Sequence, residues 1–402
     1  MDPVIEPGVT PGQRIKLYRE RAGLTQTVAA QLKGVTVSGW RKWESGERSV
    51  TSLGDWIEIA RILKVRDLYK LTGLPVGHLP DEQAEHESIA PVRAALHEYA
   101  PTLGGPVDLP GLRRAVDWTW QTWSTSPQRY TRTAPMLPEL IQTARATVEA
   151  TEGADRRDAE RVAADVYSLV RAYGKRVGAS DIAILAADRS VAAARAADDP
   201  VYRGAAAWTM AQVLSTRGHT EESASLCLDA IRDLNRHDDE AHDRLSVLGV
   251  LHLLLAVQHA RLRDERRALD ALDVAASAAA VTGETEYHHV YFGATNVGIH
   301  RAAVTLELSR PSEALRVGER VDVTNTVSTE RRYAHYLHLA RGYATQRNDL
   351  AAVHMLLRAD REVPEEATLN VLMRSLLREL VVRETPTTRP DLRPLAERAR
   401  VA

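Results

Sequence analysis

The chain has 402 residues, 44% of them hydrophobic and 26% charged, which is typical of a globular protein large enough for two or three domains. Aromatic residues make up only 5%, with a single Phe, so we expect an all-α fold. A single cysteine, Cys227, excludes an internal disulfide, and the lack of a signal pattern or a long apolar run favours a cytoplasmic protein with no membrane partner.

The net charge of −2 is unevenly distributed along the chain. Residues 10–70 contain 12 Lys and Arg against 6 Asp and Glu, whereas residues 71–402 carry a balance of −6. Five of the six lysines also lie within the first 70 residues. A basic N-terminal part on an acidic remainder favours a polyanion-binding site in the N-terminal part, although an ordinary solvated surface explains the charge equally well.

The N-terminal part carries the signals of five short helices. The sequence Thr-Pro-Gly-Gln at residues 10–13 is a helix start, in which the threonine caps, the proline takes the first helical position and the glutamine bonds back to the cap. Gly23 ends this helix, and Gly34 makes a sharp turn between the next two. Two helices of eight or nine residues around a glycine turn form a helix-turn-helix. The later helices are expected at about residues 25–32, 36–44, 52–63 and 65–71.

The stretch GQRIKLYRERAGLTQTVAAQLKGVTVSGWRKWESGERSV resembles the DNA-binding head of Cro/cI-type repressors, also called the XRE family. The similarity covers roughly residues 10–72. The matching positions are Arg19, Gly23-Leu24-Thr25-Gln26, Ala29, Gly34-Val35, Ser38 and Trp43-Glu44-x-Gly46. The resemblance implies a helix-turn-helix domain at residues 8–74 that binds double-stranded DNA. A small helical protein–protein module is the alternative.

The resemblance assigns DNA contacts to two groups of residues. Phosphate contacts are expected from residues placed around the third helix, namely Arg14, Gln26 and Arg48. Base-edge contacts in the major groove are expected from Val37, Ser38 and Lys42 on the outward side of the third helix. Arg41 lies on the same side, near either a base or a phosphate. Lys42 is the best single candidate for specificity, because Lys can donate to guanine O6 and N7.

The same resemblance predicts what supports the recognition helix. Trp40 and Trp43 are expected in the core of the head rather than stacked on bases. Arg19, late in the first helix, and Glu44, at the end of the third, occupy the two family positions that form a largely buried ion pair. We therefore expect this pair to hold the two helices together.

A polar, acidic stretch follows the head and reads as a linker at residues 75–88. Residues 89–150 are expected to form connecting helices that pack on the following domain. Within them Trp118, Trp120 and Trp123 mix spacings, so at least one must leave the buried face. Packing between head and body is the expected role of this cluster, and stacking on a ligand is the alternative.

A helical-repeat pattern appears from about residue 165. Ala340, Tyr343, Ala352, Leu356, Ala359 and Pro364 have the offsets that define a tetratricopeptide-type helix hairpin. The same offsets recur from Ala211 and Ala256, less well from Ala302, and more weakly through Tyr173. Small residues in this pattern let paired helices approach closely, and larger ones fill the groove between hairpins. We expect a degenerate tetratricopeptide-like, right-handed α-solenoid over residues 151–392.

Head and body together resemble regulators, common in high-GC bacteria, that fuse a Cro/cI-type head to a tetratricopeptide-like domain. In peptide-sensing relatives the solenoid dimerises and binds its effector on the concave face. The architecture is expected to carry over, but the peptide ligand is not, because the groove residues here diverge. We expect a homodimer on a palindromic operator, and the effector is left open between a peptide, a small molecule and a small protein. The residues expected to line its groove are Trp208, Gln212, Arg261, Asn296, Arg341 and Thr345.

No catalytic constellation or nucleotide-binding motif is found in the sequence, and we expect no cofactor and no metal site. His237–His242 is expected to be a solvated loop, and His288-His289 to open the helix that leads to Asn296. The favoured function is a ligand-responsive transcriptional regulator. The alternatives are a DNA-binding protein whose body recruits a small partner protein, and an enzyme or scaffold with an incidental head.

Overall fold

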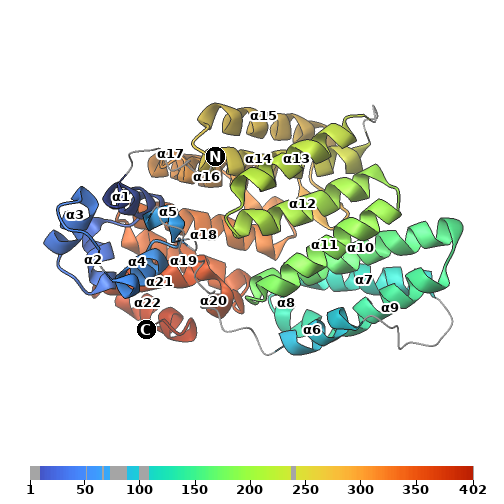
Figure 1. The fold of residues 1–402 in the computed structure, drawn as a ribbon, viewed down its shortest axis with the longest axis horizontal. Coiled ribbons are helices and arrows are strands. Elements are labelled where there is room, and N and C mark those ends of the chain that lie inside the picture. The colour runs from blue at the N-terminus through green and yellow to red at the C-terminus, as the bar shows by residue number, and fades with distance from the viewer. Residues whose placement is uncertain are drawn as a thin grey trace.

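The computed structural model describes residues 10–50, 52–65, 68–72, 88–98, 108–236 and 241–401. Within these ranges the chain is mostly helical, which confirms the expected fold class. The predicted linker lies outside them except for Ser88, and so does the first part of the His237–His242 loop. Figure 1 shows the N-terminal helices at one end of the molecule, next to the C-terminal helices.

The head is a cluster of five helices around a core of its own. The predicted capping box is confirmed, because the Thr10 hydroxyl accepts from the Gln13 N–H and the Gln13 side chain accepts from the Thr10 N–H. Gly34 (φ +74°) and Gly46 (φ +78°) end α2 and α3 in the left-handed conformation that glycine adopts without strain. The helices are α1 (Pro11–Arg21), α2 (Gln26–Lys33), α3 (Val37–Ser45), α4 (Leu53–Ile62) and α5 (Tyr69–Thr72).

The connecting helices belong to the core of the body. They are α6 (Ile89–His97), α7 (Leu109–Thr125), α8 (Arg129–Thr133), the 3-10 turn η1 (Ala134–Met136) and α9 (Leu137–Ala150). Trp120 and Trp123 are buried in the body's main hydrophobic cluster, whereas Trp118 is 52% exposed. One tryptophan thus leaves the buried face, as expected. The expectation that this cluster packs between head and body is wrong, because the buried rings face α10 and the helices around it.

The repeat region consists of successive antiparallel helix pairs, as the sequence pattern predicts. The small residues at the paired positions of each repeat are buried, among them Ala211 and Ser223, and the Ser223 hydroxyl donates to the Ala211 carbonyl (2.8 Å). Side chains this small let the two helices of a pair approach closely. The pairs are α10 (Gly153–Arg176) with α11 (Ser180–Ala196), α12 (Pro200–Thr216) with α13 (Thr220–Leu234), α14 (His242–Arg261) with α15 (Glu265–Thr282), α16 (Ala294–Glu307) with α17 (Pro311–Gly318), and α18 (Thr329–Thr345) with α19 (Asp349–Glu362).

The C-terminal part adds α20 (Glu366–Leu369), α21 (Val371–Val382) and α22 (Arg389–Arg398), after a 3-10 turn η2 (Val323–Asn325) that precedes α18. A short antiparallel hairpin interrupts the helices: β1 (Thr285–Tyr287) pairs with β2 (Val290–Phe292). Its two turn residues, His288 and His289, both have positive φ (50° and 58°). The expectation that they open a helix is wrong, since two residues with φ above zero between paired strands make a tight turn instead.

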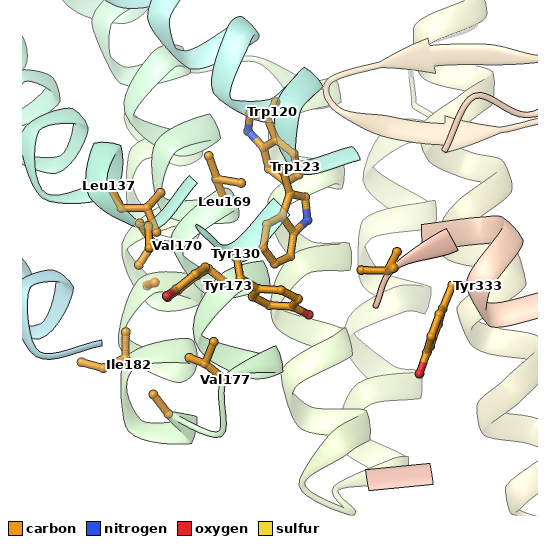
Figure 2. Close-up of a cluster of buried hydrophobic side chains, with 14 of the residues drawn as sticks. Trp120, Trp123, Tyr130, Leu137, Leu169, Val170, Tyr173, Val177, Ile182 and Tyr333 are labelled. Atoms are coloured by element: carbon orange, nitrogen blue, oxygen red, sulfur yellow. The ribbon is translucent and has the colours of Figure 1, made fainter. Parts of the chain in front are cut away.

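Polar contacts join the first helices of the body to the last repeat. Arg129 in α8 forms an ion pair with Glu366 in α20 (2.6 Å), and the Tyr130 hydroxyl donates to the same carboxylate (2.7 Å). Arg176 in α10 forms an ion pair with Glu330 in α18 (2.5 Å). Beneath them Trp123 packs against the rings of its aromatic neighbours, as Figure 2 shows. The inner side of the repeats is therefore enclosed and is not an open groove.

Candidate nucleic-acid interface and interior cavity

The outward side of α3 is open to solvent. Ser38, Arg41 and Lys42 are exposed on it, and Val37 is half-buried against the core of the head. Figure 1 places α3 at the outer edge of the molecule, at the end opposite α6 to α9. Four of the predicted contact residues thus lie on one surface that no part of the described body covers.

The remaining predicted contacts lie around this helix in different environments. Arg48 is exposed and follows α3 directly, where its backbone N–H donates to the Lys42 carbonyl (3.0 Å). Lys42 itself forms an exposed ion pair with Glu47 (3.2 Å), an interaction worth little that a DNA phosphate or base can replace. Arg14 differs from the others because it is only 6% exposed.

A hydrogen-bond network ties the recognition surface to the interior of the head. Arg41 Nε donates to Gln26 Oε1 (3.0 Å), and Gln26 Nε2 donates to Glu44 Oε2 (2.8 Å). Glu44 also accepts from Arg19 Nε (2.5 Å) and from the indole N–H of Trp40 (2.6 Å). The predicted Arg19–Glu44 ion pair is confirmed, and it is part of a network of five residues.

Glu44 is the centre of that network and stays ionised. Burial raises the pKa of Glu44, but the hydrogen bonds from Arg19, Gln26 and Trp40 outweigh burial, and the pKa lies below its ordinary value. Arg19 Nη1 also donates to the carbonyl of Leu24 (2.8 Å), which fixes the turn between α1 and α2. The buried carboxylate of Glu44 therefore fixes the position of Gln26 next to α3.

Three of the residues predicted to line an effector groove lie instead at the contact between head and body. Arg341 Nη2 donates to the Arg21 carbonyl at the end of α1 (2.9 Å), and Arg21 donates to the carbonyl of Arg261 (3.4 Å). A Cβ added to Gly23 would lie 2.8 Å from the hydroxyl of Thr345. A cleft of about 390 Å³ remains between the two parts, with Arg21, Arg261 and Arg341 in its wall.

The other three predicted residues lie inside the ring of repeats or at its wall. Trp208 and Gln212 of α12 line an interior cavity of about 50 Å³, and Gln212 Nε2 is buried without a hydrogen-bond partner among the residues that the structure describes. Asn296 is 3% exposed, and its amide donates to the Tyr291 carbonyl (2.8 Å), so it fixes the hairpin. The six residues therefore do not form one surface.

The interior cavity is lined by aromatic rings and cations from five elements. The rings come from α7, α12 and the hairpin; they are Trp120, Trp123, Trp208, His289 and Tyr291. The charged residues come from α10 and α18; they are Arg171, Lys175, Arg176, Glu330 and Arg331. The wall is therefore more polar than apolar, which suits a charged ligand better than an apolar one.

The sequence reasoning missed the cations of this cavity and the hairpin that closes it. Arg171 and Lys175 precede the first clear repeat, in a helix that matches the repeat pattern only weakly. One signal was present, however, since Lys175 is the single lysine among residues 71–402. The hairpin had no usable signal, because its turn lacks the glycine or asparagine that such turns prefer.

Among known proteins, a match is found for the head alone. Residues 12–68 match the family described as a helix-turn-helix domain. No curated protein matches the chain. In the described part of the body and head, no helix is long and apolar enough to cross a membrane. The chain thus carries an N-terminal helix-turn-helix domain followed by helical pairs consistent with a repeat.

Proposed function

We propose that this protein is a sequence-specific DNA-binding transcriptional regulator of the Cro/cI type. The observation that carries the proposal is the exposed side of α3 in a helix-turn-helix domain, with Ser38, Arg41 and Lys42 side by side. In such a domain this helix enters the major groove and its side chains reach base edges. Gln26 and Arg48 then contact phosphates on either side of the groove.

The regulator acts as a homodimer on a palindromic operator. A single head reads only a few base pairs, and a two-fold dimer doubles the site while it fixes the spacing of the half-sites at about one helical turn or a multiple of it. The docking of the head on the body supports this proposal, since a head held by Arg341 has a defined orientation relative to the repeats.

The body senses a small effector, and the head–body contact transmits its presence. Trp208 and Gln212 line the cavity and contact the effector. Arg261, Arg341 and Thr345 hold the head in the orientation that the repeats impose. The enclosed inner side favours a small molecule over a peptide or a partner protein. An effector controls DNA binding only if its affinity differs between two arrangements of head and body.

The test selects binding sites from random DNA with the full-length protein and measures the mass of the complex. We expect a palindrome of two half-sites, bound by two chains. The variant Lys42→Ala then changes the preferred base within each half-site. Glu47→Ala, which removes the solution partner of Lys42, is the control and keeps the preference. A sequence preference that survives Lys42→Ala unchanged would show that α3 does not read the operator, and a single chain on one half-site would exclude the dimer.

A further inference from the structure

The charges around the interior cavity do not balance. Glu330 is the only carboxylate among the lining residues, and it forms an ion pair with Arg176 (2.5 Å) and lies 3.6 Å from Arg129. Within the described chain, Lys175 and Arg331 have no ion-pair or hydrogen-bond partner for their side chains. A cation held away from bulk water without an opposite charge is costly, and an anion of the ligand removes that cost.

Arg171 adds a second, independent observation. It is only 4% exposed, its Nη1 reaches Gln212 Oε1 at the limit of a hydrogen bond (3.5 Å), and its Nε has no partner among the described residues. Gln212 Nε2 is also buried and has no partner in the same part of the chain. Buried N–H donors are almost always paired in native proteins, so two open donors beside one cavity indicate an acceptor that belongs there.

Aromatic rings form the rest of the wall. Arg171 lies over the ring of Trp208 (5.8 Å), and Trp120 stacks on His289 with nearly parallel planes (4.8 Å, 5°). His289 is itself a turn residue with φ of 58°, in the positive range that a two-residue hairpin turn requires. The turn thus places a flat ring on the wall.

The environment of Lys175 is consistent with an absent counter-charge. Burial and the positive charges of Arg176 and Arg171 lower the pKa of Lys175 to about 7. Burial also lowers the pKa of Arg171 to about 10. Glu330 opposes this shift in both groups without cancelling it. Each cation is thus made less favourable by burial and by its positive neighbours, which is the condition that a bound anion reverses.

The interior cavity of about 50 Å³ holds little more than the anionic group itself. Lys175 and Arg176 also line a neighbouring cavity of about 280 Å³, bounded by the ends of α11, α12 and α21. An anionic group held beside Lys175 can therefore carry its organic part into this neighbouring space. The two volumes together suit a molecule the size of a nucleoside monophosphate rather than an extended peptide.

We propose that the interior cavity binds a small organic anion, with its phosphate or carboxylate group held by Arg171, Lys175 and Arg331 and its organic part extending past Lys175 into the neighbouring cavity. The inference rests on the proposed function in one respect only, namely that this ligand is the effector. Two charge-assisted hydrogen bonds from Arg171 and Lys175 supply the affinity, and the mostly apolar wall of the neighbouring cavity, which includes Leu372, receives the organic part.

The test measures thermal unfolding of the full-length protein in inorganic phosphate and in chloride at equal ionic strength. Phosphate is expected to stabilise the wild type more than chloride does, and Lys175→Met is expected to weaken phosphate binding about tenfold or more, because one charge-assisted contact is lost. Arg157→Gln, an exposed change on the same helix, is the control and leaves phosphate binding unchanged. Equal phosphate effects in wild type and Lys175→Met, or none in the wild type, overturn the proposal.

A readout that needs no variant is the reactivity of the lysines toward an acylating reagent, followed by mass spectrometry. Phosphate is expected to raise the pKa of Lys175 and slow its labelling near neutral pH, while the five lysines of the head keep their rates. Unchanged labelling of Lys175 in saturating phosphate contradicts the site even if the variant misfolds.

The organic part is tested with adenosine monophosphate, adenosine and benzoate. Tighter binding of the monophosphate than of inorganic phosphate, lost in Leu372→Trp, which narrows the neighbouring cavity, indicates a phosphate-bearing ligand, and the same loss for benzoate indicates a carboxylate. Adenosine, which has no charge, is expected not to bind. Operator binding is measured on the same proteins. If the anion binds without changing the affinity for DNA, only its role as the effector is contradicted. If Lys42→Ala does not change the base preference, the proposed function is contradicted, but the anion site is not.

Discussion

The head and the body of this protein use cations in opposite ways. Arg41 and Lys42 project from α3 into solvent, where their charge costs little and a long polyanion can reach them. Arg171 and Lys175 project into the ring of repeats, where their charge is costly and only a small anion fits. Side chains of the same type therefore serve two classes of ligand, because burial decides which class has access.

The largest expected effect is a loss of stability of the head when the Arg19–Glu44 ion pair beneath the recognition helix is broken. Arg19→Ala leaves Glu44 buried among Gln26 and Trp40 without its cation, and removal of one partner of a buried pair costs about 3–5 kcal/mol. Such a loss is a large fraction of the stability of a small domain, so we expect the head to unfold or loosen. Hydrogen exchange of α1 to α3 in the full chain measures it, and unchanged protection would contradict the structural role of the pair.

The same pair makes the head sensitive to acid. The pKa of folded Glu44 lies below its ordinary value, so this carboxylate stabilises the fold at pH above the unfolded pKa and loses that contribution as pH falls through the folded one. Protection of the head is thus expected to fall with acidification in the wild type. The variant Glu44→Gln, which cannot titrate, provides the control and should not show this step.

The next effect concerns base readout on the exposed side. The double change Ser38→Ala and Lys42→Ala is expected to remove discrimination among DNA sites and to keep the fold, with a cost of about 1–3 kcal/mol for each good base contact. Titration against the preferred site and a scrambled one measures it. Loss of binding to both sites by the same factor would assign these two residues to phosphates instead.

Loss of a phosphate contact is expected to affect DNA binding differently from loss of a base contact. Gln26→Ala and Arg48→Ala should weaken binding to all sequences alike, and Arg48→Ala should in addition reduce the slope of affinity against salt concentration by about one. Gln26 also donates to Glu44, so its variant must first be shown to retain the melting temperature of the head. A salt slope unchanged in Arg48→Ala would place this arginine away from the DNA backbone.

A smaller effect, with the same direction of pH dependence as that of Glu44 but at higher pH, is expected from the interior. Because the pKa of folded Lys175 is lowered to about 7 from the ordinary 10.5, the unfolded chain holds a proton that the folded chain lacks between these values. The lysine's contribution to stability therefore rises with pH across this range. The difference in free energy of unfolding between wild type and Lys175→Met isolates this contribution. A difference that does not change with pH would contradict the lowered pKa of a buried Lys175. The charged or titratable groups around Lys175 are Arg171, Arg176, Arg261, Glu330, Arg331, Arg217, His289 and Tyr291.

The smallest effect is expected where the two regions meet. The double change Glu307→Gln and Arg341→Met removes the hydrogen bond to the Arg21 carbonyl without leaving a buried charge, at a cost of about 1 kcal/mol. Faster hydrogen exchange at the end of α1 is the expected sign. Glu307→Gln alone keeps the contact with the head and serves as the control; equal exchange in both variants would show that Arg341 does not hold the head.

Local patterns were enough to predict the head. The capping residue Thr10, the turn at Gly34 and the ion pair of Arg19 with Glu44 all lie where the sequence placed them. The small residues of the repeats, such as Ala211 and Ala352, are buried as expected. These features depend on neighbours within one helix or one hairpin, and so a linear pattern specifies them.

The groove could not be predicted in the same way. Position within a repeat placed Trp208 and Arg341 on one inner face, but the structure puts Trp208 at the cavity and Arg341 against the head. The tryptophans of α7 had an ambiguous spacing, and their partners lie many residues away in α10 and in the hairpin. Which inner positions stay open depends on the segments that cross them, and no repeat pattern contains those segments.

The sequence by itself determined the class of fold, the helix-turn-helix and the side of α3 that faces outward, because each follows from helix periodicity, caps and turns. Only the tertiary structure decided that the ring of repeats is closed by contacts such as Arg129 with Glu366, and that Arg171 and Lys175 share one cavity. The physical reason is the range of the interactions. Helix signals act over a few residues, whereas the energetic effect of a buried charge depends on side chains that the fold brings together from distant parts of the chain.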